Sequence, residues 1–280
     1  MIIVVLVAFG LILGSFVNAL VWRFHEQAGL AETGHKKGKP TKAELSMVKG
    51  RSMCSKCHHE LAPKDLVPLF SWVWLRGKCR YCRKPIEDSP LLEAGLPILF
   101  VVSYLSWPLA MHGEGLFTFV AWLVFLVGFV ALAAYDLRWY LLPNRIVFPL
   151  IVLAVAQVIC QIVLFDASPK ILIDAAWGVV IASGIFYVLY QISDGSWIGG
   201  GDVKLGIVLG ILAGGAFNAM LLLFIASLVG TLVALPQVLR GKSGKATKIP
   251  FGPYLLLGAF IVVLYGDRMV TAYYNMFGLA

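Results

Sequence analysis

Long uncharged apolar runs constrain this chain more than any other feature of its sequence. A helix needs roughly 20 apolar residues to cross a bilayer, and several runs approach that length. They lie at residues 1–22, 91–111, 116–135, 146–165, 171–192, 215–239 and 251–271, with a shorter run at 203–213. The mean hydropathy is +0.85 and only 14% of residues are charged, against about 25% in soluble domains. The sequence predicts an all-α polytopic membrane protein with about eight transmembrane helices, the first of which is retained rather than cleaved as a signal.

The Lys and Arg residues are distributed very unevenly among the loops that join these runs. Of 23 such residues, 21 lie in residues 23–90 or in later loops on the same side, and only Lys170 and Arg268 lie in the alternate loops. The later loops on that side are residues 136–145, 193–204 and 240–250. Because positively charged loops remain cytoplasmic, we predict an outward N-terminus and a cytoplasmic 23–90 loop. Topology and attraction to anionic lipid account for the net charge of +8, so we expect a lipid bilayer partner and no nucleic acid.

Residues 23–90 are the only stretch polar enough to form a separate aqueous module. We therefore divide the chain into a first transmembrane helix (1–22), a cytoplasmic loop (23–90) and a membrane-embedded helical domain (91–280). The first half of the loop contains few large apolar residues, and a segment of that kind is expected to be flexible.

Two C-x2-C pairs lie in the second half of this loop. The four residues are Cys54, Cys57, Cys79 and Cys82. Each C-x2-C turn can direct two sulfurs at one ion, so the pattern is typical of a tetrahedral zinc site. Two disulfides are the alternative, which the predicted cytoplasmic location disfavours. Four thiolates leave no open coordination position, so we predict a structural zinc ion. His58 and His59 are further possible ligands, and we expect them to be solvated loop residues.

Two carboxylates stand out because they lie at the ends of apolar segments. Asp136 ends one such segment in AAYDLRWYLLPN, and Asp202 begins the short one in GGGDVKLG. A carboxylate near hydrocarbon is costly unless it is paired or reaches water, so such residues are functional candidates. Both are assigned to the same membrane face, and the 66 residues between them allow the chain to cross out and back. We therefore expect the two carboxylates to meet.

Two adjacent carboxylates share a proton, because both cannot easily ionise at once. The ionised partner can then remove a proton from water while the neutral partner polarises a peptide carbonyl, which predicts peptide hydrolysis. Gly199, Gly200 and Gly201 remove side chains beside Asp202, so an extended peptide can approach and the loop can adopt unusual dihedral angles. The alternative is that Asp202 only caps the following helix. Lys204 either counters the nearby charge or anchors the chain at the lipid interface.

Several separate motifs occur along the chain: GSFVNALVWR (14–23), the cysteine pairs with WLRGKCRYC, SPLLE (89–93), YDL with LLPN, GGGDVKLG and PFGP (250–253). Taken together and in order, these motifs resemble those of the bacterial type IV prepilin peptidases, membrane aspartic proteases of the GxGD type. The resemblance covers essentially the whole chain and implies that Asp136 and Asp202 are the catalytic pair.

This resemblance implies cleavage of the basic leader of type IV prepilins and pseudopilins, on the cytoplasmic side of a bacterial inner membrane. Many members then methylate the new N-terminal amine with S-adenosylmethionine, and relatives that lack the cysteine region act as peptidases alone. The four cysteines favour the bifunctional form, and Glu93 is our candidate for the cofactor site.

The chain departs from the family pattern at three places: LPN, with Asn144, replaces the common LPD, FHE follows Arg23 where LP is usual, and the polar insert before Cys54 is longer than expected. The long insert and the few acids of the loop leave open a peptidase without methyltransferase activity. Two other functions also compete. A transporter can use the same two acids to carry protons or cations, although a transport site belongs near the midplane. A non-enzymatic assembly protein can dock a partner through the zinc module.

Overall fold

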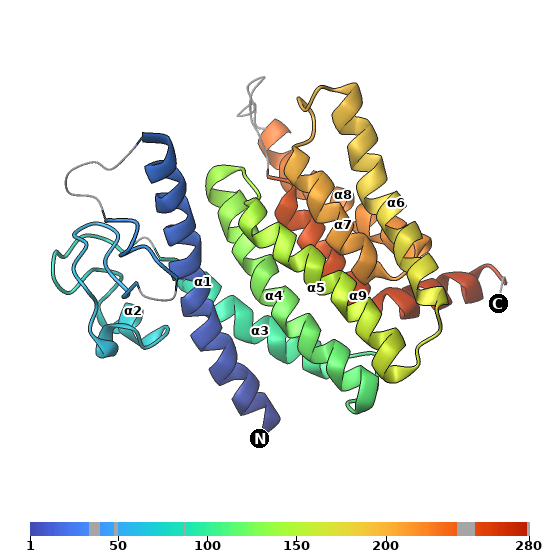
Figure 1. Cartoon of the computed structure of the whole chain (residues 1–280), viewed down its shortest axis with the longest axis horizontal. Helices are drawn as coiled ribbons and strands as arrows, with labels where there is room; N and C mark the ends of the chain where they lie inside the picture. The colour runs from blue at the N-terminus through green and yellow to red at the C-terminus, as the bar shows by residue number, and fades with distance from the viewer. Residues whose placement is uncertain (34–39, 48–49, 87, 240–249, 279–280) are drawn as a thin grey trace. The chain divides into compact units, whose positions relative to one another are not determined.

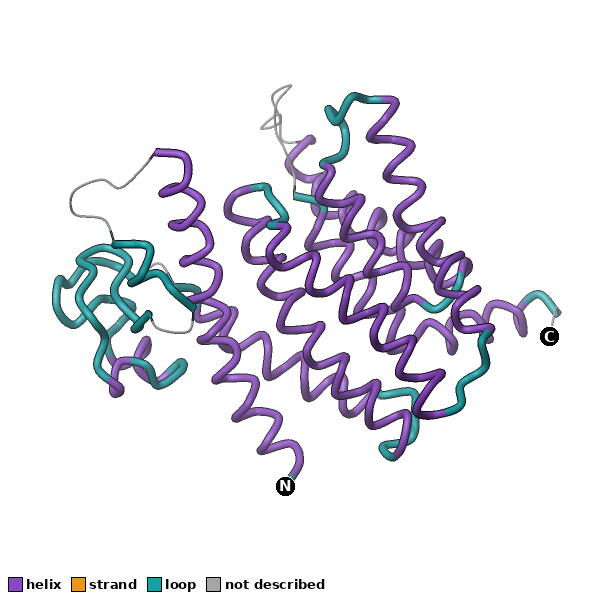
Figure 2. Tube along the Cα trace, viewed as in Figure 1, coloured by secondary structure: helices purple, strands orange, loops and turns teal. Residues whose placement is uncertain are grey.

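The computed structural model describes residues 1–33, 40–47, 50–86, 88–239 and 250–278. Within these ranges the ordered elements are helices, with two isolated β-bridges (Figures 1 and 2). They are α1 (Ile2–Thr33), η1 (Pro63–Asp65), α2 (Phe70–Trp74), α3 (Pro90–Ser106), α4 (Gly113–Trp139), α5 (Asn144–Phe165), α6 (Lys170–Ile192), α7 (Gly200–Ala213), α8 (Ala216–Leu239) and α9 (Gly252–Met276). The prediction of an all-α membrane protein is confirmed.

Each predicted apolar run corresponds to one helix. Among the described residues, six helices are long and apolar enough to span a bilayer: α1, α4, α5, α6, α8 and α9. The two others are shorter, at 17 residues for α3 and 14 for α7. At 1.5 Å per residue α7 is only about 21 Å long, so it cannot cross the roughly 30 Å hydrocarbon core.

The first helix continues well beyond its apolar run. Helix α1 ends at Thr33 rather than near residue 22, so the start of the segment that we expected to be flexible is helical. Residues 24–33 include Ala, Leu, Glu and Gln, which are good helix formers even where they do not face lipid. The rest of that segment lies partly in 34–39 and 48–49, outside the described residues.

The chain forms two compact units, residues 1–105 and 106–280. The division falls after α3 rather than at residue 90, so α3 belongs with α1 and the cysteine-rich loop. The functional division into 1–22, 23–90 and 91–280 stays a prediction.

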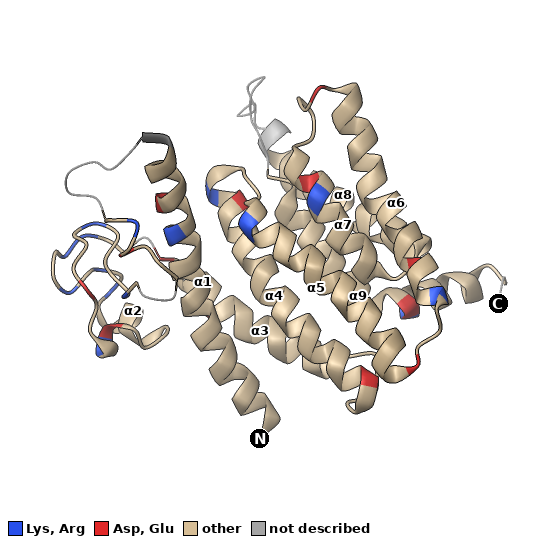
Figure 3. Ribbon diagram, viewed as in Figure 1, with Lys and Arg blue, Asp and Glu red and all other residues tan. Residues whose placement is uncertain are grey.

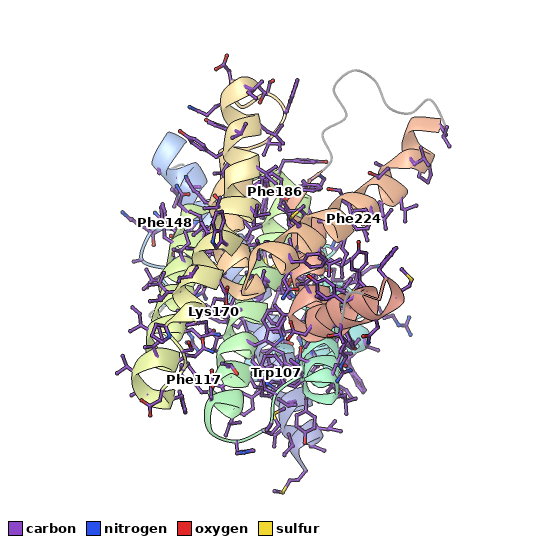
Figure 4. The ribbon with its side chains drawn as sticks, turned by 90° about the vertical axis from the view of Figure 1, so that its right-hand side faces the viewer. Trp107, Phe117, Phe148, Lys170, Phe186 and Phe224 are labelled. Carbon is purple, nitrogen blue, oxygen red and sulfur yellow. The ribbon has the colours of Figure 1, made fainter. Side chains whose placement is uncertain are left out.

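The C-terminal unit is a bundle of α4 to α9 whose helix bodies carry few charged residues (Figure 3). Apolar side chains cover its exterior, and Phe148 and Phe224 project outward from α5 and α8 (Figure 4). Its interior holds an aromatic cluster in which Trp122 of α4 stacks on Phe260 of α9 with ring centroids 6.1 Å apart. An apolar exterior of this kind suits contact with lipid chains.

Small residues bring α6 and α7 into close contact. A Cβ atom on Gly178 of α6 would lie 2.1 Å from the carbonyl oxygen of Gly210 in α7. Further along the same interface, the Ser183 hydroxyl donates a 2.8 Å hydrogen bond to the carbonyl of Val203. Close approach through small residues and interhelical hydrogen bonds are the usual basis of helix packing in lipid. This interface fixes α7, and Asp202 with it, against α6.

In the N-terminal unit, the GSFVN segment of α1 packs against the start of α3. A Cβ atom on Gly14 would lie 2.7 Å from the Cα of Glu93. The Asn18 amide both donates to the carbonyl of Ser89 (3.1 Å) and accepts from its N–H (3.2 Å). Asn18 is therefore a buried link between the two helices, as is usual for polar residues in membrane bundles.

Arg23 orders the loop that leads to the cysteines. Its side chain is buried, and its guanidinium donates to the backbone carbonyls of Ser46, Gly50 and Arg51 at 2.9 to 3.1 Å. These hydrogen bonds give the buried guanidinium its acceptors in the backbone, and they anchor the loop to α1.

Candidate functional site

Asp136 lies in the last turn of α4, and only 6% of its surface is exposed. Its Oδ2 accepts a 3.1 Å hydrogen bond from the backbone N–H of Gly252, the first residue of α9. A Cβ atom at Gly252 would lie 2.6 Å from the same oxygen, so glycine is required for the contact. The structure thus adds Gly252, in the PFGP segment, to the surroundings of Asp136.

Asp202 lies in the first turn of α7 and is half-buried. The N-cap of this helix is Gly199, and no side chain caps it. Asp202 is the third residue of the helix rather than its N-cap, and its carboxylate accepts a hydrogen bond from the backbone N–H of Gly199. The alternative of a capping role therefore stays open beside the catalytic one. The expected unusual dihedral angles are absent, because Gly199 has an extended backbone with φ −74° and ψ 145°, and neither Gly200 nor Gly201 has a positive φ.

The two carboxylates are close enough to interact electrostatically. The turn between α4 and α5 explains how their helices come together. A Cβ atom on Gly201 would lie 2.9 Å from the Cβ of Leu142, and one on Gly252 would lie 3.5 Å from the Leu142 Cδ2. Leu142 thus packs against the starts of both α7 and α9, so that three distant segments converge beside the acids.

Lys204 connects α7 to α5. Its Nζ donates a 3.0 Å hydrogen bond to the Asn144 side-chain oxygen and lies 5.7 Å from the centre of the Phe148 ring. Asn144 is the residue at which LPN departs from the family's usual LPD, and it therefore supplies a neutral acceptor to this cation. Lys204 helps to fix the start of α7 relative to the start of α5.

A groove of about 320 Å³ lies on α8 and the start of α9. It is lined by Ser227, Gly230, Thr231, Ala234, Phe251 and Tyr254. Because Phe251 directly precedes Gly252, the groove ends beside the residue that binds Asp136.

In the N-terminal unit, the structure brings the four predicted cysteines together. Their Sγ atoms all lie within 4.8 Å of one another, and the thiols are not joined as disulfides. The two knuckles repeat one backbone pattern: His58 and Arg83, each following the second cysteine of its pair, have positive φ angles and donate N–H groups to the carbonyls of Cys54 and Cys79. The geometry follows from the local sequence of each pair.

This tetrad fits a divalent metal ion. Tetrahedral coordination with Zn–S bonds of about 2.3 Å places sulfurs about 3.8 Å apart, close to the 4.0 Å between the Sγ atoms of Cys54 and Cys82. A backbone hydrogen bond from Lys84 lowers the pKa of the Cys82 thiol to about 7, whereas burial raises the pKa of the Cys54 thiol to about 12. A metal ion would displace the remaining protons.

A cavity of about 80 Å³ adjoins the tetrad within the same unit. Its lining includes Ser15, Asp65, Trp72, Arg80, Asp88 and Glu93. The Glu93 Oε2 accepts a 2.7 Å hydrogen bond from the backbone N–H of Leu69, which has a φ of 60°. Glu93 therefore joins the first turn of α3 to the residue that precedes α2.

Asp65 holds η1 against the second knuckle. Its carboxylate accepts hydrogen bonds from Arg80 Nε at 2.7 Å and from the Tyr81 hydroxyl at 3.1 Å. Burial alone would raise the pKa of Asp65, but these hydrogen bonds and the Arg80 charge outweigh it and hold the pKa below its usual value. The carboxylate thus remains ionised and fixes one wall of the cavity.

Two family models match the chain. The bacterial Peptidase A24 N-terminal domain matches residues 8–107, and the type IV leader peptidase family matches residues 123–235. No solved structure shows a significant match.

Curated relatives match over most of their length and carry the name prepilin leader peptidase/N-methyltransferase. The relative from Bacillus subtilis is 31% identical, and the alignment covers 97% of this chain and 98% of that protein. The Pseudomonas aeruginosa relative is 29% identical over 96% of this chain and 92% of its own length. The Xanthomonas campestris relative is 33% identical over 76% of this chain and 71% of its own length.

We expect the cysteine tetrad to bind one metal ion per chain. Replacing Cys79 by Ser should lower the bound metal several-fold, because a hydroxyl is a poor substitute for a thiolate ligand. Elemental analysis of the purified protein measures this. Cys160→Ser is the matched control, since Cys160 lies in α5 outside the tetrad, and it should bind as much metal as the wild type. Equal metal content in the two variants would contradict the assignment.

Proposed function

This chain belongs to the type IV leader peptidase family, and on that premise we propose that it removes the basic leader of type IV prepilins and pseudopilins by using Asp136 and Asp202. The observation that carries the proposal is the convergence of two carboxylates from distant helices, α4 and α7, within electrostatic range of each other. Such a pair is the minimum that an aspartic peptidase requires.

In the proposed reaction, one carboxylate is ionised and the other is protonated. The ionised group takes a proton from a water molecule, whose oxygen attacks the scissile carbonyl carbon while the protonated group donates a hydrogen bond to the carbonyl oxygen. The C–N bond then breaks, and the departing amine receives the proton that was taken from water. The hydrogen bond from the Gly252 N–H to Asp136 Oδ2 orients one carboxylate for this reaction.

The position of the acids along their helices favours peptidase over transporter. Asp136 lies in the last turn of α4 and Asp202 in the first turn of α7, so both acids lie near helix ends. A transport site is expected near the bilayer midplane, whereas a leader outside the hydrocarbon must be cut near the surface. We infer from the Lys and Arg distribution that this surface is cytoplasmic.

The groove on α8 is suited to the apolar part of such a substrate. A prepilin continues beyond its cleavage site as a hydrophobic helix, and the groove begins beside Gly252 and runs along α8. Small residues such as Gly230 and Ala234 permit close helix approach. We infer that the substrate helix lies here while its leader junction reaches the two acids.

We also propose that the N-terminal unit methylates the new N-terminus with S-adenosylmethionine, and that its metal is a structural zinc ion. S-adenosylmethionine supplies an electrophilic methyl group when bound. The cavity beside the tetrad has acidic side chains, Asp88 and Glu93, and the Trp72 indole in its lining, which fit the sulfonium cation. Its volume of about 80 Å³ is below the 300 Å³ or more of typical ligand pockets, so it fits only part of the donor.

We expect Asp136→Asn and Asp202→Asn each to abolish leader cleavage, a loss of at least about 10³-fold if both groups take part in proton transfer. The assay incubates purified protein in detergent with a prepilin and reads product masses. Asp166→Asn, at an exposed helix end, is the control and should cleave normally. Cleavage by either folded dyad variant would refute the mechanism, and no cleavage by the folded wild type would favour the transporter.

Gly252→Ala should impair the same cleavage without changing any acid. Its methyl group would lie 2.6 Å from Asp136 Oδ2 and would displace the carboxylate, and a misplacement of about 1 Å can cost roughly 10²-fold in rate. Gly184→Ala in α6, whose added methyl group would have no neighbour within 4 Å, is the matched control. Equal rates for the two variants would show that the Gly252 contact does not position the acid.

Glu93→Gln should lower methylation while leader cleavage continues. The Gln side chain keeps an oxygen acceptor for the Leu69 N–H but loses the negative charge that would face the sulfonium. Product masses with and without S-adenosylmethionine measure both reactions at once. Methylation at the wild-type rate in this variant would remove Glu93 from the cofactor site, and a wild type that cleaves without adding a methyl group would show a peptidase alone.

A further inference from the structure

An exposed apolar patch lies on the cysteine-rich module, outside the spanning helices. It consists of Val67, Phe70, Val73 and Trp74, on and just before α2. Trp74 is 83% exposed, Phe70 77% and Val73 67%. A contiguous patch of this kind on an aqueous module indicates a contact surface rather than free contact with water.

The segment that carries the patch has a defined inner side. Trp72 and Leu75 line the cavity beside the cysteine tetrad, and the Ser71 hydroxyl donates to the Val67 carbonyl at 2.8 Å. The outward direction of Phe70, Val73 and Trp74 is therefore set by the packing of the residues between and beside them.

The position of the patch relative to α3 follows from Glu93. This residue lies in the first turn of the apolar helix α3, and its carboxylate holds the Leu69 N–H at 2.7 Å. Leu69 precedes Phe70 directly, so α2 begins beside the start of the apolar helix α3. Figure 1 shows α2 at the edge of the module that lies toward the N-terminal, apolar end of α1.

Basic residues flank the patch. Lys64, Arg76 and Lys78 are exposed on either side of it along the chain. The nearby acid Asp65 is turned inward, with a side chain only 2% exposed and bound to Arg80. The surroundings of the patch thus present cations to whatever covers it.

We propose that the apolar patch inserts into the headgroup region of an anionic bilayer and anchors the cysteine-rich module to the membrane surface. Aromatic residues prefer the interface between hydrocarbon and water, and an apolar surface bordered by Lys and Arg binds anionic lipid. The tether through α1 and α3 already keeps the module beside the membrane, so a five-residue helix with its flanking residues suffices.

Photocrosslinking tests this proposal on the full-length protein. Benzoylphenylalanine replaces Trp74, and the protein is reconstituted into nanodiscs of phosphatidylethanolamine and phosphatidylglycerol. Irradiation should give covalent lipid adducts, detected by mass, at a yield several-fold above that of the same group at Lys56, an exposed residue of the first knuckle. The double variant Arg76→Glu, Lys78→Glu should lower the yield at position 74, and added salt should lower it in the parent.

Two results would overturn the proposal. One is a lipid-adduct yield at position 74 no higher than at position 56, which would mean that the patch faces water. The other is crosslinking mainly to residues 106–280, to a second copy of the chain or to the prepilin, which would identify a protein contact. Both labelled variants should melt at the same temperature in detergent, because both replaced side chains are exposed.

Discussion

Lipid offers the backbone no hydrogen-bonding partners, and the architecture of this protein depends on that constraint. Peptide groups in the hydrocarbon must be satisfied within the chain, so each apolar run becomes a helix. Burial of apolar surface then distinguishes poorly between helix partners, because lipid chains are equally apolar. Which helices pack together therefore depends on small residues and a few polar groups. Examples are the close contact of Gly178 with Gly210 and the hydrogen bond from the Ser183 hydroxyl to the Val203 carbonyl.

The short helix α7 shows how that packing supports chemistry. It is too short to span the bilayer, and its contacts with α6 fix where its first turn lies. The α4–α5 turn then brings Leu142 against Gly201, and the start of α9 brings the Gly252 N–H against Asp136. Both carboxylates lie near helix ends, in the last turn of α4 and the first turn of α7.

A few polar contacts likewise join the elements of the N-terminal unit. Asn18 joins α1 to α3, Arg23 joins α1 to the loop, and Glu93 joins α3 to the residue before α2. Glu93 lines the cavity beside the tetrad, and it also fixes the position of the apolar patch relative to α3. Its substitution by Gln separates the roles, since the backbone contact needs an oxygen and the cofactor site needs the charge.

The sequence alone determined the features that have local or compositional causes. Hydropathy located α1 and α3 to α9 among the described residues, each C-x2-C turn predicted its half of the tetrad, and the scarcity of acids in apolar segments singled out Asp136 and Asp202. It missed the helical end of α1, because polar helix formers there lack the apolar run by which we recognised helices. It also missed Gly252, which acts on Asp136 through a backbone N–H 116 residues away and carries no side chain to indicate a role. Only the tertiary structure decided that the start of α9 joins these two helix ends and which carboxylate accepts which donor, because in lipid those choices depend on the fit of small residues between helices distant in the sequence.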